Sequence, residues 1–186
     1  MNHPIFGELA SGVLGDAACQ WETDPILIPN LKRKAVFVFE LEEPEDWDDE
    51  EEEFIDAWST SIPEEMLSCA EEIYNGSEEY FESVAKIIAD HYMEFKRPYY
   101  LKSVDNPAWG DHPPKAEDFP AIEEPNQMWD LLKNISIHIN QTPGIEGVIE
   151  PEPPEIRYSC ATTFDVEHGY SVTFQNGELT EIVLDG

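Results

Sequence analysis

The densest group of side chains with binding chemistry is an acidic run at residues 42–53. The wider segment 40–56 carries twelve carboxylates, and no Lys or Arg occurs between Lys34 and Lys86. Carboxylates in such numbers attract cations and basic protein surfaces. A tryptophan buried in a protein contact is a common source of binding energy. We therefore predict a partner-binding surface made of Asp46, Trp47, Asp48, Asp49, Glu50, Glu51, Glu52, Glu53 and Trp58.

The same run allows two other interpretations. Its acidic side chains can form the solvated face of a helix, with the tryptophans in the core. Its start can also bind a divalent cation weakly, but the D-x-[DN]-x-[DN]-G spacing and the turn glycine of an EF-hand are missing. We therefore predict no specific metal site here.

A second candidate group lies near the C-terminus, where Asp165, Glu167 and His168 fall within four residues. A carboxylate beside an imidazole can act as a base, and with a divalent metal these residues would suit a hydrolase. The alternative is ordinary turn chemistry, in which Asp165 and Gly169 shape the backbone. The sequence has no H-E-x-x-H pair that would favour a metalloenzyme.

Other catalytic patterns are missing. There is no G-x-S-x-G elbow, and the glycines of residues 7–15 lack the G-x-G-x-x-G spacing of a phosphate-binding loop. Cys19, Cys69 and Cys160 are far apart, include no C-x-x-C pair and are typical of free thiols in a reducing compartment. We predict a binding protein rather than an enzyme, with no cofactor.

The overall charge limits the class of partner. The chain has 41 acidic and 10 basic residues, a formal net charge of −31 in 186 residues. Such a protein repels nucleic acid, anionic membranes and phosphate-rich substrates, so we predict a basic protein partner and no direct contact with nucleic acid or membrane. A further alternative is a nucleic-acid mimic whose carboxylates imitate phosphates. With no signal peptide or apolar span, we expect a cytoplasmic location.

Despite this charge, the chain has the composition of a folded protein, with five Trp, seven Tyr and nine Phe. Its length suits one domain, residues 1–186. Residues 5–9 and 35–41 read as strands, and the near-continuous apolarity of residues 35–41 predicts burial on both faces. A helical segment follows at residues 44–97, in which Ser61 and Glu64 fit a capping box.

The clearest element is a helix over residues 77–96, with Ser77 as its N-cap and apolar residues at i, i+3, i+4 and i+7. It should end near Pro98. His91 lies on its apolar stripe and is predicted to be a core residue. Residues 103–125 are rich in proline and predict an irregular surface loop.

The C-terminal part begins with a short helix at residues 127–133 and a strand at residues 135–139, whose side chains alternate strictly. A meander follows, with Asn176 and Gly177 as a hairpin turn. We predict an α+β fold, in which an antiparallel sheet from the N- and C-terminal strands carries the central helices on one face.

Several motifs together resemble a known group. They are Phe6-Gly7-x-Leu9, the strand 35–41, Trp129-x-Leu131-Leu132, and Asp165-x-Glu167-His168-Gly169-Tyr170-x-Val172-x-Phe174-x-x-Gly177. The chain resembles small, uncharacterised bacterial α+β domains of unknown function. Similar small acidic proteins occur among immunity proteins encoded beside polymorphic toxins, so the resemblance implies an immunity-type inhibitor of a basic toxin. It implies no catalytic residues, and the loop 103–125 and the run 42–53 depart from the pattern.

Overall fold

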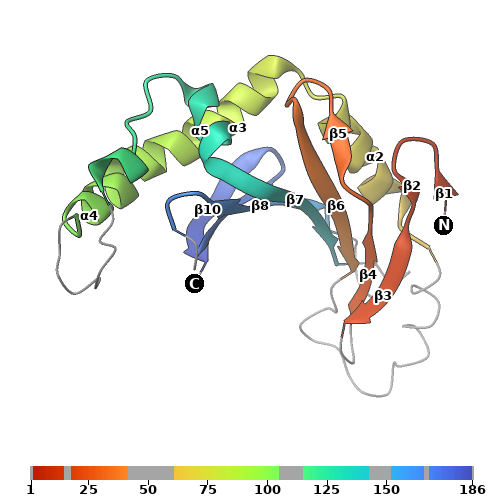
Figure 1. Ribbon diagram of the computed structural model, residues 1–186. Helices are drawn as coiled ribbons and strands as arrows, with labels where there is room; N and C mark the ends of the chain where they lie inside the picture. Colours follow the sequence, from red (N-terminus) through yellow and green to blue (C-terminus); the bar gives the residue numbers. More distant parts are fainter. Residues whose placement is uncertain are drawn as a thin grey trace.

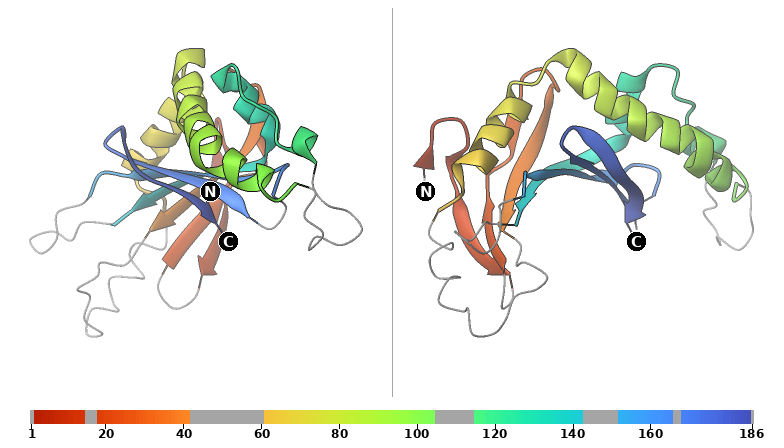
Figure 2. Two further views of the ribbon diagram at one scale, coloured as in Figure 1. Left: turned by 90° about the vertical axis from the view of Figure 1, so that its left-hand side faces the viewer. Right: turned by 180° about the vertical axis from the view of Figure 1, so that it is seen from behind.

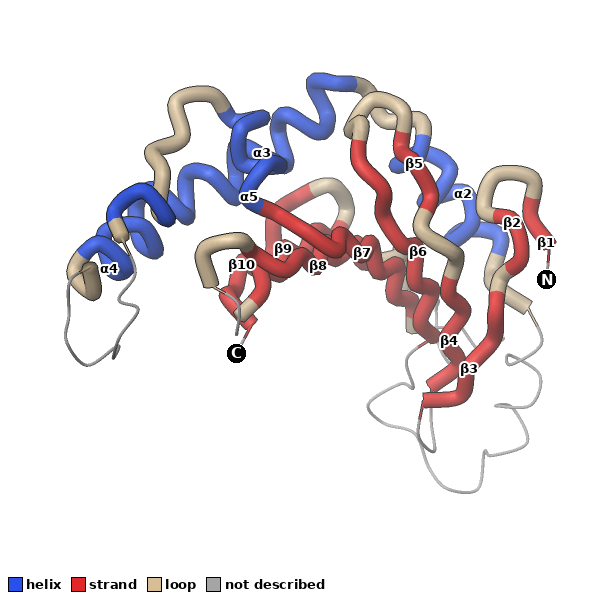
Figure 3. Tube along the Cα trace, viewed as in Figure 1, coloured by secondary structure: helices blue, strands red, loops and turns tan. Residues whose placement is uncertain are grey.

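The computed structural model describes residues 2–14, 18–41, 61–104, 115–142, 152–165 and 168–185. Helices lie against a large β-sheet, which confirms the predicted α+β class (Figures 1 and 3). The strands are β1 (Asn2–His3), β2 (Gly7–Glu8), β3 (Ala10–Leu14), β4 (Ala18–Glu22), β5 (Ile26–Ile28), β6 (Arg33–Leu41), β7 (Leu132–Gln141), β8 (Glu155–Thr162), β9 (Gly169–Gln175) and β10 (Glu178–Asp185). The helical segments are α2 (Glu64–Tyr74), α3 (Glu78–His91), the π-helical η2 (Tyr92–Lys96), α4 (Arg97–Leu101), the 3₁₀ turns η4 (Ala116–Asp118) and η5 (Pro125–Gln127), and α5 (Met128–Leu131).

The main sheet is mixed, and the prediction of a purely antiparallel sheet is wrong. Its order is β10-β9-β8-β7-β6-β4-β3, with β5 paired to the start of β6. The central strands β6 and β7 run parallel, from Ala35 opposite Ile135 to Leu41 opposite Gln141. Parallel neighbours need a long crossover, and the segment between these two strands contains α2 and α3. The other neighbouring pairs of the sheet are antiparallel.

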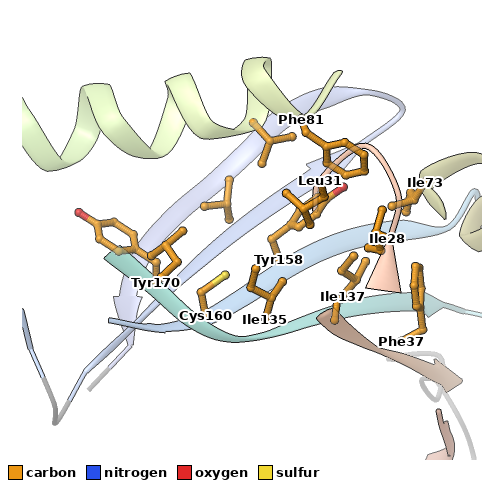
Figure 4. Close-up of a cluster of buried hydrophobic side chains, with 14 of the residues drawn as sticks. Ile28, Leu31, Phe37, Ile73, Phe81, Ile135, Ile137, Tyr158, Cys160 and Tyr170 are labelled. Carbon is orange, nitrogen blue, oxygen red and sulfur yellow. The ribbon is translucent and has the colours of Figure 1, made fainter. Parts of the chain in front are cut away.

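The core lies between α3 and the face of the sheet that the helix covers (Figure 4). Alternate residues of each strand point to this face because side chains of a strand alternate. Phe81 points from α3 toward the sheet, where it meets side chains from several strands. The buried residues labelled on these strands are Ile28, Phe37, Ile135, Ile137, Tyr158, Cys160 and Tyr170. On the opposite face of β6, Val38 is also buried, in agreement with the predicted two-sided burial.

The helix starts differ in how well the sequence predicts them. Ser77 caps α3 as predicted, since its Oγ accepts a hydrogen bond from the Tyr80 N–H at 3.2 Å. The Ser61–Glu64 capping box does not form, because α2 begins at Glu64 itself, with Pro63 as its N-cap and no side-chain cap. A proline at this position fixes φ at a value that suits the start of a helix, but its side chain has no atom that can accept a hydrogen bond. The first amide groups of the helix therefore have no side-chain acceptor from it.

The helix does not end at Pro98 as predicted. After His91 the backbone passes through the π-helical turn η2, in which the Arg97 N–H donates to Tyr92 O, and α4 then carries the helix to Leu101. Pro98 stands in the first turn of α4, where a residue without an N–H loses no hydrogen bond. The π-helical turn thus lets the helix continue past a proline.

The remaining expectations are met in part. α3 and its continuation extend beyond the sheet at α4 (Figure 1 and the right-hand view of Figure 2), so the helices are not clearly packed on one face of the sheet as we predicted. In the described part of the proline-rich segment, residues 103–104 and 115–125, the backbone is irregular apart from η4 and the start of η5, yet Phe119 there is buried. Asn176 and Gly177 form the predicted hairpin turn with positive φ angles of 53° and 77°. Among the described helices, none has the length and apolar character needed to cross a membrane.

Candidate functional site

The residues predicted to bind a partner, Asp46 to Glu53 and Trp58, lie outside the described residues, as does Glu167. The partner-binding surface at the acidic run therefore stays a prediction. The described chain does carry further acidic surface, a turn cluster around Asp165, and a polar cluster on the sheet.

The acidic surface lies on α2 and the first turns of α3, which follow each other directly in the chain (Figure 1). Both helices are amphipathic, so the residues between the buried positions face solvent. We define the acidic helix surface as Glu64, Glu65, Glu72, Glu78, Glu79 and Glu82, all exposed. Glu78 accepts a hydrogen bond from Lys32 Nζ at 2.9 Å. Among the described residues, this is the one ion pair between the acidic helix surface and a Lys or Arg.

The turn cluster begins with a set of hydrogen bonds that hold the backbone between β8 and β9. Thr162 Oγ1 donates to Asp165 O at 2.7 Å and accepts from the Asp165 N–H at 3.0 Å. The His168 N–H donates to Asp165 Oδ1 at 3.2 Å, and His168 Nδ1 lies 2.9 Å from Asp165 Oδ2. The predicted carboxylate–imidazole pair of Asp165 and His168 is thus formed, and the same carboxylate also shapes the turn.

The structure adds Tyr100 to this cluster, a residue that the sequence did not suggest. Tyr100 Oη donates to Asp165 Oδ2, which ties α4 to the turn. The ring is buried and stacks on Phe119, with centroids 5.0 Å apart and planes within 3°. Burial first, and then the Asp165 carboxylate, raise the pKa of Tyr100, so its hydroxyl keeps its proton and stays a donor. The predicted helix ends near Pro98, before Tyr100, so helical periodicity could not indicate which way the Tyr100 side chain points.

This arrangement fixes the imidazole of His168 by a carboxylate, as in many general bases, and the His168 side chain is 39% exposed. No set of three or more His, Cys, Asp or Glu side chains within the described ranges is arranged to hold a metal ion.

The polar cluster lies on the face of the sheet opposite α3. Glu40 Oε2 is 3.3 Å from both His138 Nδ1 and Arg157 Nη2, so three adjacent strands contribute one residue each. The hydrogen bond with His138 chiefly lowers the pKa of Glu40, helped by the positive charges of His138 and Arg157 and opposed by burial. The sequence signal was present: Glu40 is the acidic residue of an otherwise apolar strand end.

Next to this cluster, several buried polar atoms lack a hydrogen-bond partner. Asn140 pairs with Glu40 on β6 and Glu155 on β8 in the sheet register and is buried. Among the described residues, neither its amide nitrogen nor its amide oxygen has a partner, and Arg157 Nε lacks one as well. Most buried polar side chains in folded proteins are hydrogen-bonded, so this face carries uncompensated polarity.

Comparison with known proteins gives a family but no characterised relative. No curated protein and no solved structure is significantly similar to this sequence. A family model described as "Domain of unknown function (DUF6985)" matches residues 5–184. This match spans the strands of both chain ends and the helices between them, and the chain therefore belongs to the DUF6985 family of domains of unknown function.

Proposed function

We propose that this protein binds a basic protein partner through its acidic surface. The observation that carries the proposal is the acidic helix surface, whose six exposed carboxylates are matched by one Lys or Arg ion pair in the described structure. Together with a net charge of −31, such a surface speeds encounter with a basic protein and selects against acidic ones.

In its finer form, the proposal is an immunity-type inhibitor that acts in the cytoplasm on a basic toxin. The acidic run from Asp46 to Glu53 would extend the docking surface, and Trp47 or Trp58 would supply the buried anchor. Support for this form comes from the resemblance to small bacterial domains of unknown function, because similar small acidic proteins occur among immunity proteins.

The experiment is capture of a partner, followed by quantitative binding. The tagged protein is used as bait in host lysate at low and high salt, and a retained protein is then purified and its association rate and Kd are measured. One variant replaces Glu50 to Glu53 by Gln, and another carries Glu64→Gln, Glu65→Gln and Glu72→Gln. We expect a basic protein whose association rate falls by about ten-fold or more on neutralisation and as salt is raised.

The matched control carries Glu178→Gln and Glu181→Gln, two exposed acids on β10, away from the acidic helix surface. It should bind like the unchanged protein. A Kd that is indifferent to salt, or an equal loss in the β10 control, would contradict docking through the acidic surface.

A second candidate function is hydrolysis, favoured by the contact of His168 Nδ1 with Asp165 Oδ2 at 2.9 Å. The test is a screen of chromogenic ester, amide and phosphate substrates with the unchanged protein and with His168→Gln. Activity that His168→Gln abolishes would support a base at His168. Equal rates in both proteins would leave the pair as a turn-stabilising contact.

A further inference from the structure

The continuation of α3 carries large aromatic side chains that are exposed to solvent. Phe95 lies in η2 and is 57% exposed, and Tyr99 lies in α4 and is 68% exposed. Among the described residues, two other large apolar side chains are exposed, one on β5 and one on β10. Single exposed apolar side chains are common, whereas neighbouring ones often mark a contact surface. Phe95 and Tyr99 are neighbours because they lie four residues apart on one helix.

The π-helical turn η2 directs both rings outward. In an α-helix, the residues three and seven positions after the buried Tyr92 would be Phe95 and Tyr99, on the same face as Tyr92. The hydrogen bond from the Arg97 N–H to Tyr92 O spans five residues instead of four, which adds one residue to the turn. The buried position therefore moves from Tyr99 to Tyr100, which is 8% exposed. Because π-helical turns are rare and frequently lie at functional sites, this turn also indicates a binding surface.

Both rings rest on side chains that hold them in place. The ring of Phe95 contacts that of His91, with centroids 5.2 Å apart, and the ring of Tyr99 contacts that of Tyr100 at 5.5 Å. Tyr100 is itself tied to the β8–β9 turn, since its hydroxyl donates to Asp165. The aromatic side chains are thus presented on an anchored part of the helix, which reduces the ordering cost of binding.

Basic side chains lie beside these rings. Residues 93–102 hold three basic residues and one acidic residue, a net charge of +2 in a protein whose total charge is −31. Among the described residues, neither Lys96 nor Lys102 forms an ion pair, although acids outnumber bases by 41 to 10. Tyr99 lies three residues from each lysine, so the three side chains are neighbours on the helix. We define the basic aromatic surface as Phe95, Lys96, Tyr99 and Lys102.

We infer that the basic aromatic surface binds an acidic peptide segment of another protein. An apolar side chain of the segment packs on Phe95 and Tyr99, and its carboxylates pair with Lys96 and Lys102. The inference goes beyond the proposed function. The acidic helix surface lies on α2 and the first turns of α3, whereas this surface lies beyond the other end of α3 and has the opposite charge (Figure 1).

The charge of the whole protein decides between a short acidic segment and a longer polyanion. Nucleic acid or an anionic membrane would also face the rest of the surface, which a net charge of −31 makes repulsive. A short peptide segment meets mainly the local charge of residues 93–102, because salt screens charges that are more than about 8 Å away. The observations therefore favour a peptide segment of a protein.

The test is titration of the full protein with the blocked peptide acetyl-Glu-Asp-Phe-Glu-Leu-Asp-Glu-amide, followed through the backbone amide signals in NMR spectra. We expect saturable shifts centred on residues 93–102 that weaken as salt is raised. The neutral peptide, with Gln and Asn in place of Glu and Asp, should not produce them. Phe95→Ser combined with Tyr99→Ser should weaken binding about five-fold or more. Lys96→Gln combined with Lys102→Gln should weaken it about two- to ten-fold, as expected for two exposed ion pairs.

The matched controls are Leu179→Ser, an exposed apolar residue of β10, and Lys34→Gln, an exposed lysine of β6. Both should bind the acidic peptide like the unchanged protein. Urea unfolding should show the same stability for all four variants, because every substituted side chain is at least partly exposed.

The inference is overturned if no saturable shift appears, if the neutral peptide produces an equal shift, or if the controls lose as much binding as the surface variants. Tighter binding of a ten-nucleotide oligodeoxythymidine, or of phosphatidylglycerol vesicles, than of the acidic peptide would also overturn it. A dimer at low salt that the Phe95→Ser and Tyr99→Ser variant abolishes would identify a second copy of this chain as the occupant instead.

Discussion

The two faces of the central sheet differ in the polar side chains that they bury and in the hydrogen bonds of those side chains. On the face toward α3, the buried side chains are mainly apolar. The hydroxyl groups of Tyr80 and Tyr158 form a hydrogen bond with each other there, with an Oη–Oη distance of 2.7 Å. On the opposite face, Glu40 pairs with Arg157 and His138, while the amide of Asn140 beside them has no partner among the residues that the structure describes. The helix-covered face therefore supplies most of the apolar burial, and the other face keeps a buried amide that costs stability.

The largest expected effect comes from opening the helix-covered face at Phe37. This residue is fully buried, and its ring lies 5.0 Å from that of Phe6. Phe37→Ala should lower the free energy of unfolding by about 3–5 kcal/mol, because it removes apolar contacts and leaves a cavity. Urea unfolding measures the change. Leu27→Ala, at an exposed position of β5, is the control and should change stability by less than about 0.5 kcal/mol.

A smaller loss is expected from Glu40→Gln on the opposite face. The change leaves Arg157 and His138 without their carboxylate and should cost about 1–3 kcal/mol near neutral pH. The folded protein lowers the pKa of Glu40 below its ordinary value of 4.5. The carboxylate therefore contributes its full stability above pH 4.5 and loses it as the pH falls through the lowered pKa.

Unfolding of both proteins at several pH values checks this sign. The stability difference between the unchanged protein and Glu40→Gln should shrink as the pH falls below 4.5. A difference that grows on acidification would contradict the assignment. Glu178→Gln on β10 serves as the exposed control and should show no such pH-dependent difference.

Asn140→Leu should change stability in the other direction. Its buried amide has no partner in the part of the chain that the structure describes, so an apolar side chain of similar size removes a desolvation cost and should raise the free energy of unfolding by about 1 kcal/mol. Asn140→Asp is the matched comparison and should destabilise, since it buries a charge beside Glu40 and Glu155. If Asn140→Leu is itself destabilising, the amide binds a water or ligand in solution.

The smallest effect is expected at Tyr80→Phe, which leaves the hydroxyl of the fully buried Tyr158 without its partner. We expect a loss of about 1 kcal/mol, the lower end of the cost of leaving a buried hydroxyl without a partner. Tyr99→Phe, at an exposed position of α4, should have no measurable effect on the free energy of unfolding. A loss as small at Tyr80 as at Tyr99 would mean that the tyrosine pair adds nothing to the helix-covered face.

The parts of the fold that could be predicted depend on local signals. The alternation of residues 135–139, the cap at Ser77 and the turn at Asn176–Gly177 each arise from neighbouring residues, and each is present in the structure. The direction of β7 beside β6 could not be predicted, because apolar patterns do not encode strand orientation. The passage of the helix beyond Pro98 depends on a π-helical turn that has no sequence signature here.

The candidate site was predictable to the same extent. Asp165 and His168 lie three residues apart, so their contact followed from turn chemistry. Tyr100 approaches the same carboxylate from a segment 65 residues earlier, which only tertiary packing can bring about. The outward direction of Phe95 and Tyr99 likewise depends on the π-helical turn rather than on a local sequence pattern. The acidic run, in contrast, was evident from composition alone, and its role stays a prediction.

The parallel pairing of β6 with β7 also has a consequence for biosynthesis. Ala35 pairs with Ile135, so the most apolar strand of the N-terminal part emerges from the ribosome about a hundred residues before its neighbour. Pairing over such a sequence separation is slow, and an unpaired apolar strand edge can aggregate in the meantime. The twelve carboxylates of residues 40–56 begin at the end of this strand. We expect this charge to keep the incomplete chain soluble until the second half of the sheet is made.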